Sequence, residues 1–123
     1  MKRTAICFLF LLLAFSTAAQ TNRITAAEAK DHIGEVRTVC GKVVSTHYAT
    51  SSKGQPTFLN LDEPYPKEIL TILIWGSDRA KFGTPETKYK DARVCMTGKI
   101  TSRREKPEII ATEPGQIVQQ KEA

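Results

Sequence analysis

The stretch "ILTILIWGSDRAKF", Ile69–Phe82, decides how the rest of the chain is interpreted. Leu and Ile dominate its first half, so residues 69–76 are predicted to form a strand that is apolar on both faces. Its second half carries a helix-start signal at Ser77, and a Thr-Pro-Glu signal of the same kind follows at residues 84–86. The sequence therefore predicts a strand that is followed directly by helical turns.

Four further strands are predicted from β-branched residues in alternating patterns, two before this stretch and two after it. They are residues 36–46, 57–63, 92–102 and 108–117. Residues 47–56 contain Ser, Gly and Pro breakers and predict a polar loop. A capping box at Thr25 and Glu28, with a glycine at position 34, predicts a two-turn helix over residues 26–33.

Five strands with a helical segment between the third and the fourth form the element order of an OB-fold, an all-β, five-stranded Greek-key barrel. In this chain a short N-terminal helix precedes the first strand. An SH3-like barrel also has five strands, but it lacks a helical insertion of this length. The element order therefore favours the OB-fold.

Four segments carry a resemblance to a known superfamily. They are "AKDHIGEVRTVCGKVVSTHY" at 29–48, "PTFLNLDEPYP" at 56–66, "LTILIWGSDRAKF" at 70–82 and "VCMTGKI" at 94–100. These segments resemble single OB-fold modules of the nucleic-acid-binding, anticodon-binding-like superfamily, nearest to exported single-domain bacterial proteins and to modules attached to extracytoplasmic nucleases. The resemblance runs from Ile24 to Ile117. It implies binding of single-stranded nucleic acid across the second and third strands, with the loops after the first and fourth strands closing over it.

The first residues resemble an export signal. A charged start, "MKR", precedes an apolar run and the small residues "STAAQ". This pattern predicts a signal peptide at residues 1–19, cut near Ala19, and hence a secreted or periplasmic protein; an uncleaved membrane anchor is the alternative. Residues 20–118 are predicted to form the OB-fold domain and residues 119–123 a disordered tail. Removal of the leader lowers the formal net charge of the 123-residue chain from +5 to +3, which by itself indicates no polyanionic partner.

Two cysteines of the mature chain lie in a phrase that the sequence repeats. The phrase reads "TVCGKVVST" at residues 38–46 and "RVCMTGKITS" at residues 93–102. The first and fourth strands of an OB-fold are antiparallel neighbours, so the two phrases would lie side by side. We therefore expect a disulfide between Cys40 and Cys95, as an oxidising compartment allows. A pair of small buried thiols is the alternative.

A barrel that binds a single strand needs cations, which follow the phosphates, and flat rings on which bases stack. The two loops that the resemblance places side by side supply both kinds of residue. They offer His47, Tyr48 and Lys53 after the first strand, and Arg103, Arg104 and Lys106 after the fourth. One basic and aromatic rim is therefore expected from two distant parts of the sequence, although a charged turn can also be merely solvated.

The second and third strands add three candidates, Phe58, Asn60 and Trp75. Phe58 and Trp75 form a stacking platform if they point outward and belong to the core if they point inward. Periodicity leaves the choice open, because both faces of the third strand are apolar. Tyr65 and Tyr89 lie in loops beside Pro or Lys and are expected to pack as lids rather than to contact a ligand.

No catalytic constellation can be assembled from the sequence. Asp62 and Glu63 are neighbours and would point to opposite faces of a strand, whereas a nuclease needs carboxylates gathered around a metal ion. His32 and His47 have no partner at metal-ligand spacing. We therefore expect a protein that is not an enzyme, with no catalytic residue, no cofactor and no metal.

The sequence thus predicts a secreted or periplasmic OB-fold monomer, free of the membrane in its mature form, that binds single-stranded DNA or RNA with low sequence specificity. The alternative is an extracytoplasmic module that binds a protein partner or an envelope ligand. A basic rim around Phe58 and Trp75 would favour nucleic acid, and an apolar face without Lys or Arg would favour the alternative.

Overall fold

The computed structural model describes residues 23–121. The expected signal peptide at residues 1–19 lies outside these residues. Within residues 23–121, no helix is both long enough and apolar enough to cross a membrane.

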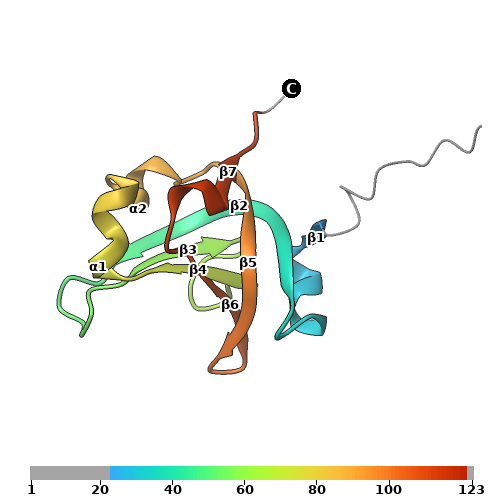
Figure 1. Cartoon of the computed structure of the whole chain (residues 1–123). Coiled ribbons are helices and arrows are strands. Elements are labelled where there is room, and N and C mark those ends of the chain that lie inside the picture. Colours follow the sequence, from blue (N-terminus) through green and yellow to red (C-terminus); the bar gives the residue numbers. More distant parts are fainter. Residues whose placement is uncertain (1–22, 122–123) are drawn as a thin grey trace, which may run out of the picture.

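Five strands close into a barrel, which confirms the all-β OB-fold (Figure 1). They are β2 (Val36–Tyr48), β3 (Thr57–Leu61), β4 (Leu70–Ile74), β5 (Arg93–Arg103) and β6 (Lys106–Ile110). The order around the barrel is β2, β3, β4, β6 and β5, and the pairing of β5 with β2 closes it. The β4–β6 pair is parallel and the other pairs in the barrel are antiparallel.

Two short strands that the sequence analysis missed extend the sheet. Strand β1 (Arg23–Thr25) runs parallel to β2, and β7 (Ile117–Gln119) runs antiparallel to β5. The predicted fifth strand was therefore too long, because β6 ends at Ile110 and a 3₁₀ turn, η4 (Pro114–Gln116), precedes β7. The amide of Gln120 also donates to the carbonyl of Arg93, so the sheet still holds the chain where the disordered tail was expected to begin.

The predicted N-terminal helix is shorter and tighter than expected. It is a 3₁₀ helix, η2 (Ala26–Asp31), instead of an α-helix over residues 26–33. Its capping box is present, because the Thr25 hydroxyl accepts from the Glu28 amide and the Glu28 carboxylate accepts from the Thr25 amide. Ala26 and Ala29 are its buried residues, and this spacing of three matches the three residues per turn of a 3₁₀ helix.

The helical connection between β4 and β5 is present, in three short pieces. These are α1 (Gly76–Arg79), η3 (Ala80–Phe82) and α2 (Pro85–Lys88). They lie beside one end of the barrel (Figure 1). The side chains of Phe82 and Tyr89 are each 2% exposed and belong to the core, so Tyr89 packs as the sequence predicted.

The core fixes which faces of β3 and β4 point outward. Leu59 and Leu61 of β3, with Leu70, Ile72 and Ile74 of β4, are fully buried in the barrel. Because successive side chains of a strand point to opposite faces, the intervening residues lie on the outer surface. The outer face of this two-strand unit therefore carries Phe58, Asn60, Thr71 and Leu73.

A disulfide joins Cys40 and Cys95, as the sequence predicted. The two residues are directly opposed in the β2–β5 ladder. The adjacent Gly41 makes room for another backbone contact, because a Cβ atom there would lie 2.9 Å from the Asp62 carboxylate. That carboxylate accepts a 3.0 Å hydrogen bond from the Lys42 amide, so it fastens the end of β3 to β2.

Candidate functional site

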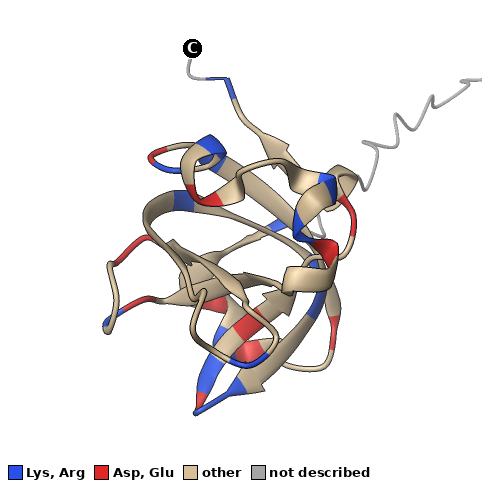
Figure 2. Cartoon of the chain, turned by 90° about the vertical axis from the view of Figure 1, so that its left-hand side faces the viewer, with Lys and Arg blue, Asp and Glu red and all other residues tan. Residues whose placement is uncertain are grey.

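A groove of about 980 Å³ lies on the outer face of the barrel. Its floor is the outer surface of β2, β3, β4 and β6, and its walls are the β2–β3 loop, the β3–β4 loop and the β5–β6 turn. Figure 2 shows basic residues gathered at the β5–β6 turn, at the lower end of the molecule in that view, with acidic residues close by. It is larger than a second pocket, of about 260 Å³, that lies nearby.

A row of aromatic and apolar residues runs across four strands, and its aromatic half, His47 and Phe58, lines the floor of the groove. His47, Phe58, Leu73 and Ile110 face one another in the register of β2, β3, β4 and β6. The rings of His47 and Phe58 are stacked, with centroids 6.5 Å apart and planes inclined by 6°. Leu73 is fully buried and Ile110 is partly exposed, and neither of them lines the groove. The His47–Phe58 pair offers a flat surface on which a planar ligand can lie.

A polar row crosses the same floor one step along the strands. It consists of Ser45, Asn60, Thr71 and Glu108, again in register. The Thr71 hydroxyl donates to the Asn60 side-chain oxygen at 3.0 Å, and the Asn60 amide donates to the Ser45 hydroxyl oxygen at 3.0 Å. The Ser45 hydroxyl therefore acts as an acceptor in this network. Its own proton is available to an acceptor outside the network.

Trp75 forms part of the wall and is half-buried, which settles the open question about its side chain. It lies at the N-terminal end of α1. A Cβ atom on Gly54 of the β2–β3 loop would come within 3.0 Å of the indole ring, so only glycine lets that loop lie flat against it. The guanidinium carbon of Arg103 lies 6.0 Å from the centroid of the indole, at the outer limit of a cation–π contact.

Four cations line the groove, Lys53, Arg103, Arg104 and Lys106. Lys106 is the most constrained, because its ammonium group pairs with Glu68 at 3.3 Å and donates to the Pro66 carbonyl. Lys53, Arg103 and Arg104 are exposed, and no ion pair engages them within residues 23–121. Three cations of the rim are therefore available to an anionic ligand.

Two carboxylates also line the groove, Glu68 and Glu108. Glu68 is neutralised by Lys106. Glu108 is 8% exposed, and burial raises the pKa of its carboxyl group, while the charge of Arg103 partly opposes that rise. A raised pKa means that the charged form of Glu108 is poorly solvated by its surroundings.

Eight of the nine residues that the sequence predicted for a binding site line this groove. They are His47, Lys53, Phe58, Asn60, Trp75, Arg103, Arg104 and Lys106. Tyr48 does not, because it follows His47 in β2 and points away. The Arg79 guanidinium lies 3.9 Å above the centre of the Tyr48 ring and pairs with Glu86, so Tyr48 helps to hold the helical connection on β2.

Among the groove residues that sequence reasoning missed are Ser45, Tyr65, Thr71 and Glu108. The expectation that Tyr65 packs as a lid is wrong, because its side chain is 75% exposed. Thr71 and Glu108 could have been found from alternation, since each is a polar residue beside a buried Ile in a strand. Glu108 was predicted as the last residue of a charged turn and the first residue of the fifth strand, whereas β6 already begins at Lys106.

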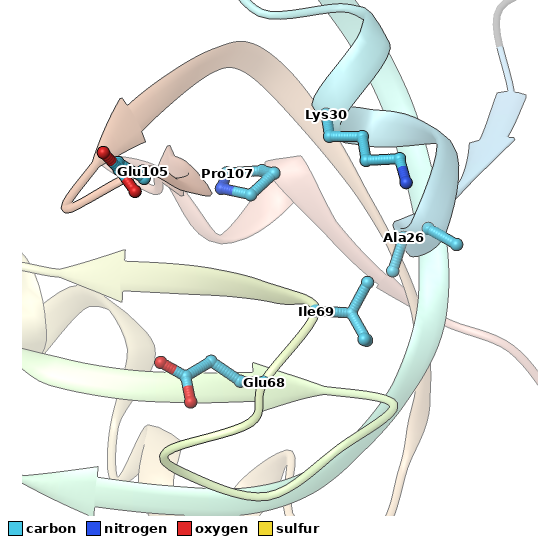
Figure 3. Close-up of a pocket in the computed structure, with 7 residues that line it drawn as sticks. Ala26, Lys30, Glu68, Ile69, Glu105 and Pro107 are labelled. Carbon is cyan, nitrogen blue, oxygen red and sulfur yellow. The ribbon is translucent and has the colours of Figure 1, made fainter.

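A smaller pocket of about 260 Å³ lies on the other side of the β3–β4 loop (Figure 3). Ala26 and Lys30 of η2 meet Ile69, Glu105 and Pro107 there, and Glu68 lines both pockets. Figure 3 shows Lys30 and Glu105 approaching from different sides of the opening. Residues 23–121 contain no cluster of three or more His, Cys, Asp or Glu side chains that could hold a metal ion.

Comparisons with known proteins place the fold more firmly than the function. No protein-family model and no curated protein matches the sequence. Among solved structures, the chain is similar to the crystal structure of a protein described as an aspartyl-tRNA synthetase from Leishmania major Friedlin, with a TM-score of 0.50 and 11% sequence identity. The match covers 88% of this chain and 22% of that chain. At this identity the likeness concerns the fold alone, and it agrees with the OB-like barrel described above.

Proposed function

We propose that the protein binds single-stranded nucleic acid in the groove on the outer face of β2, β3 and β4. The observation that carries the proposal is the union of aromatic and basic residues in one groove. The His47–Phe58 stack and Trp75 supply flat surfaces for bases. Arg103 and Arg104 stand on the rim, where phosphates of the same strand would pass.

The arrangement favours an extended single strand over a duplex. In a duplex the flat faces of the bases are stacked on one another and cannot reach a ring on a protein. An unpaired strand can turn its bases toward the floor and its phosphates toward the rim. Stacking is tolerant of sequence because every base has a flat face, so we propose low sequence specificity for most positions of the strand.

A protein partner is the alternative ligand for the same groove. Lys53, Arg103 and Arg104 border the Trp75 and Phe58 surface, and a basic border of this kind favours a polyanion over an apolar peptide. Nucleic acid is therefore the ligand that the groove fits better.

The proposal is tested by fluorescence polarisation with a labelled mixed-sequence oligonucleotide of about fifteen nucleotides, within the ~4–16 nucleotide range of one OB-fold. Three rim cations predict that log K falls linearly with log salt, with a slope of about −2, because each contact to a single strand contributes about −0.7. A duplex of the same sequence should bind more weakly. Absence of binding to the single strand at low salt would refute the proposal.

Charge-reversal variants distinguish binding in the groove from binding that depends only on the overall positive charge of the protein. The double substitution Arg103→Glu and Arg104→Glu should weaken binding at least tenfold and flatten the salt slope by about 1 to 2, because two phosphate contacts are lost. The matched control is Lys90→Glu with Lys99→Glu, which changes the net charge equally at two exposed residues outside the groove. Equal losses in both double variants would mean that binding is not located in the groove.

We also propose that the protein is exported and acts as a binder without catalysis. The leader pattern at residues 1–19 supports export, and intact-mass measurement of the protein from the producing cell checks it. A chain that begins near Gln20 is the expected result, and a chain that still begins at Met1 would contradict it. The labelled oligonucleotide should stay intact when incubated with the protein and Mg²⁺, and its cleavage would contradict a purely binding role.

A further inference from the structure

A buried carboxylate in the floor of the groove has no role in the attraction of a polyanion. Glu108 lies on β6, and its side chain opens on the groove although the residue is only 8% exposed. Within residues 23–121 its carboxylate makes no hydrogen bond and no ion pair. An unpaired carboxylate at this depth costs free energy in the unliganded protein, so a ligand that donates hydrogen bonds to it gains from the contact.

The hydrogen-bond donors nearest to Glu108 in the described part of the chain are engaged with other partners. Thr71, its neighbour on β4, uses its hydroxyl proton to reach Asn60. Lys106, two residues away on β6, pairs with Glu68 instead. Arg103 on β5 acts on Glu108 only through the field of its charge. The polar row therefore ends at β6 in the Glu108 carboxylate, which receives no hydrogen bond from any donor in residues 23–121.

We propose that Glu108 recognises one guanine base of the bound strand, a refinement that rests on the nucleic-acid binding proposed above. A carboxylate presents two acceptor oxygens side by side. The Watson–Crick edge of guanine presents two donors side by side, the ring N1–H and the exocyclic amino group, and single-stranded bases are recognised on this edge. The two edges match as a bidentate pair.

The other bases fit less well for the same reason. Adenine and cytosine place one donor beside a ring nitrogen that is an acceptor, so a lone pair would face the second oxygen of Glu108. Uracil and thymine place one donor between two carbonyl oxygens. Repulsion between a carboxylate oxygen and an acceptor atom of the wrong base gives specificity without any additional contact to the protein. Guanine should therefore be preferred at one position of a strand that is otherwise bound without regard to sequence.

The probes are four labelled thymidine oligonucleotides of about ten nucleotides, unchanged or with one central thymidine replaced by guanine, adenine or cytosine. At pH 8 the guanine probe should bind roughly five- to tenfold more tightly than the other three, which is the lower end of what one bidentate pair supplies. In Glu108→Gln the side chain offers one acceptor beside one donor, a pair that all four bases can match on their Watson–Crick edges, so the preference for guanine should disappear. Substitution of a residue that only supports the fold would weaken the binding of all four probes alike.

The matched control is Glu105→Gln. It removes one negative charge from the turn that precedes β6, and Glu105 lines the smaller pocket and not the groove (Figure 3). It should raise the affinity for all four probes alike and leave the guanine preference intact. Circular dichroism and thermal unfolding of both variants verify that they fold.

Acidification provides a second readout in the unmodified protein. A protonated Glu108 is a donor beside an acceptor, so the ratio of guanine to adenine affinity should fall from pH 8 toward pH 5. His47 on β2, Glu68 in the β3–β4 loop, Arg103 on β5 and Lys106 on β6 also face the groove. Their charges act on the phosphates of all four probes alike, and the same ratio followed in Glu108→Gln over this pH range gives the part of the change that does not come from Glu108.

The outcomes separate the two proposals. If none of the four probes binds at low salt, the nucleic-acid function itself fails. If all four bind with equal affinity, or if Glu108→Gln and Glu105→Gln show the same order of preference as the unmodified protein, the strand-binding function stands and the reading of guanine by Glu108 is wrong.

Discussion

Reduction of the Cys40–Cys95 disulfide should destabilise the barrel by several kcal/mol. The bond joins residues that are 55 positions apart, so it closes a loop that holds about half of the described chain. The chain-entropy relation for a loop of that size gives about 4 kcal/mol at 25 °C, between about 3 for 15 residues and about 4.7 for 100. This is a large share of the roughly 5–15 kcal/mol that stabilises a typical domain.

The measurement compares urea unfolding of the oxidised protein with that of the same protein kept in a thiol reductant. The same sequence in both samples avoids any change in packing. The expected loss of about 4 kcal/mol in the free energy of unfolding corresponds to a fall of roughly 15–30 °C in Tm, because 1 kcal/mol shifts the Tm of a domain of this size by about 4–8 °C. Equal stability in the two samples, or two reactive thiols in the oxidised, denatured protein, would refute the reasoning.

Three further predictions concern single residues. Gly54→Ala should cost about 1–2 kcal/mol and change the emission of the protein's single tryptophan, because Gly54 has φ +78° and lies against Trp75; unchanged stability and emission would contradict that packing. Arg79→Ala should cost about 1–3 kcal/mol in urea unfolding, because Glu86 loses its partner, yet leave oligonucleotide affinity unchanged; lost affinity would mean that this side of the barrel binds. Glu108→Gln should raise the free energy of unfolding at pH 7 relative to the unmodified protein and lose that advantage near pH 4. The pKa of Glu108 is raised on folding, so its stabilising contribution is present below the unfolded pKa and is lost as pH rises through the folded one; a constant difference across pH would contradict this.

The order of the barrel strands and the disulfide could be predicted because both depend on strong local signals. The helical turns after Ile74 distinguish the OB-fold from other small barrels, and the repeated cysteine phrase places Cys40 opposite Cys95 once the fold is assumed. Strands β1 and β7 could not be predicted in this way. Each has three residues, which is too few to show an alternation, and each forms by pairing with a strand distant in sequence.

The site was predicted less completely, because the end of β2 and the start of β6 were assigned to loops or turns. His47 and Tyr48 were both assigned to a loop, where neighbouring side chains can point the same way. In the structure they end β2, and alternation along the strand sends His47 into the groove and Tyr48 toward Arg79. Glu108 was missed by the same kind of error at the start of β6. The depth at which Trp75 lies depends on the β2–β3 loop that covers it, and no periodicity in the sequence reports such a contact.

The location of the ligand tests the account most directly. Two-dimensional ¹H–¹⁵N spectra of the labelled protein, recorded at low salt during titration with an unlabelled single-stranded oligonucleotide, report on every backbone amide. We predict shifts at His47, Phe58, Asn60 and Arg104 and in the indole N–H of Trp75, with α2 and β7 unchanged. A titration without shifts, or with shifts confined to the helical connection and β7, would contradict the assignment of the groove as a nucleic-acid interface.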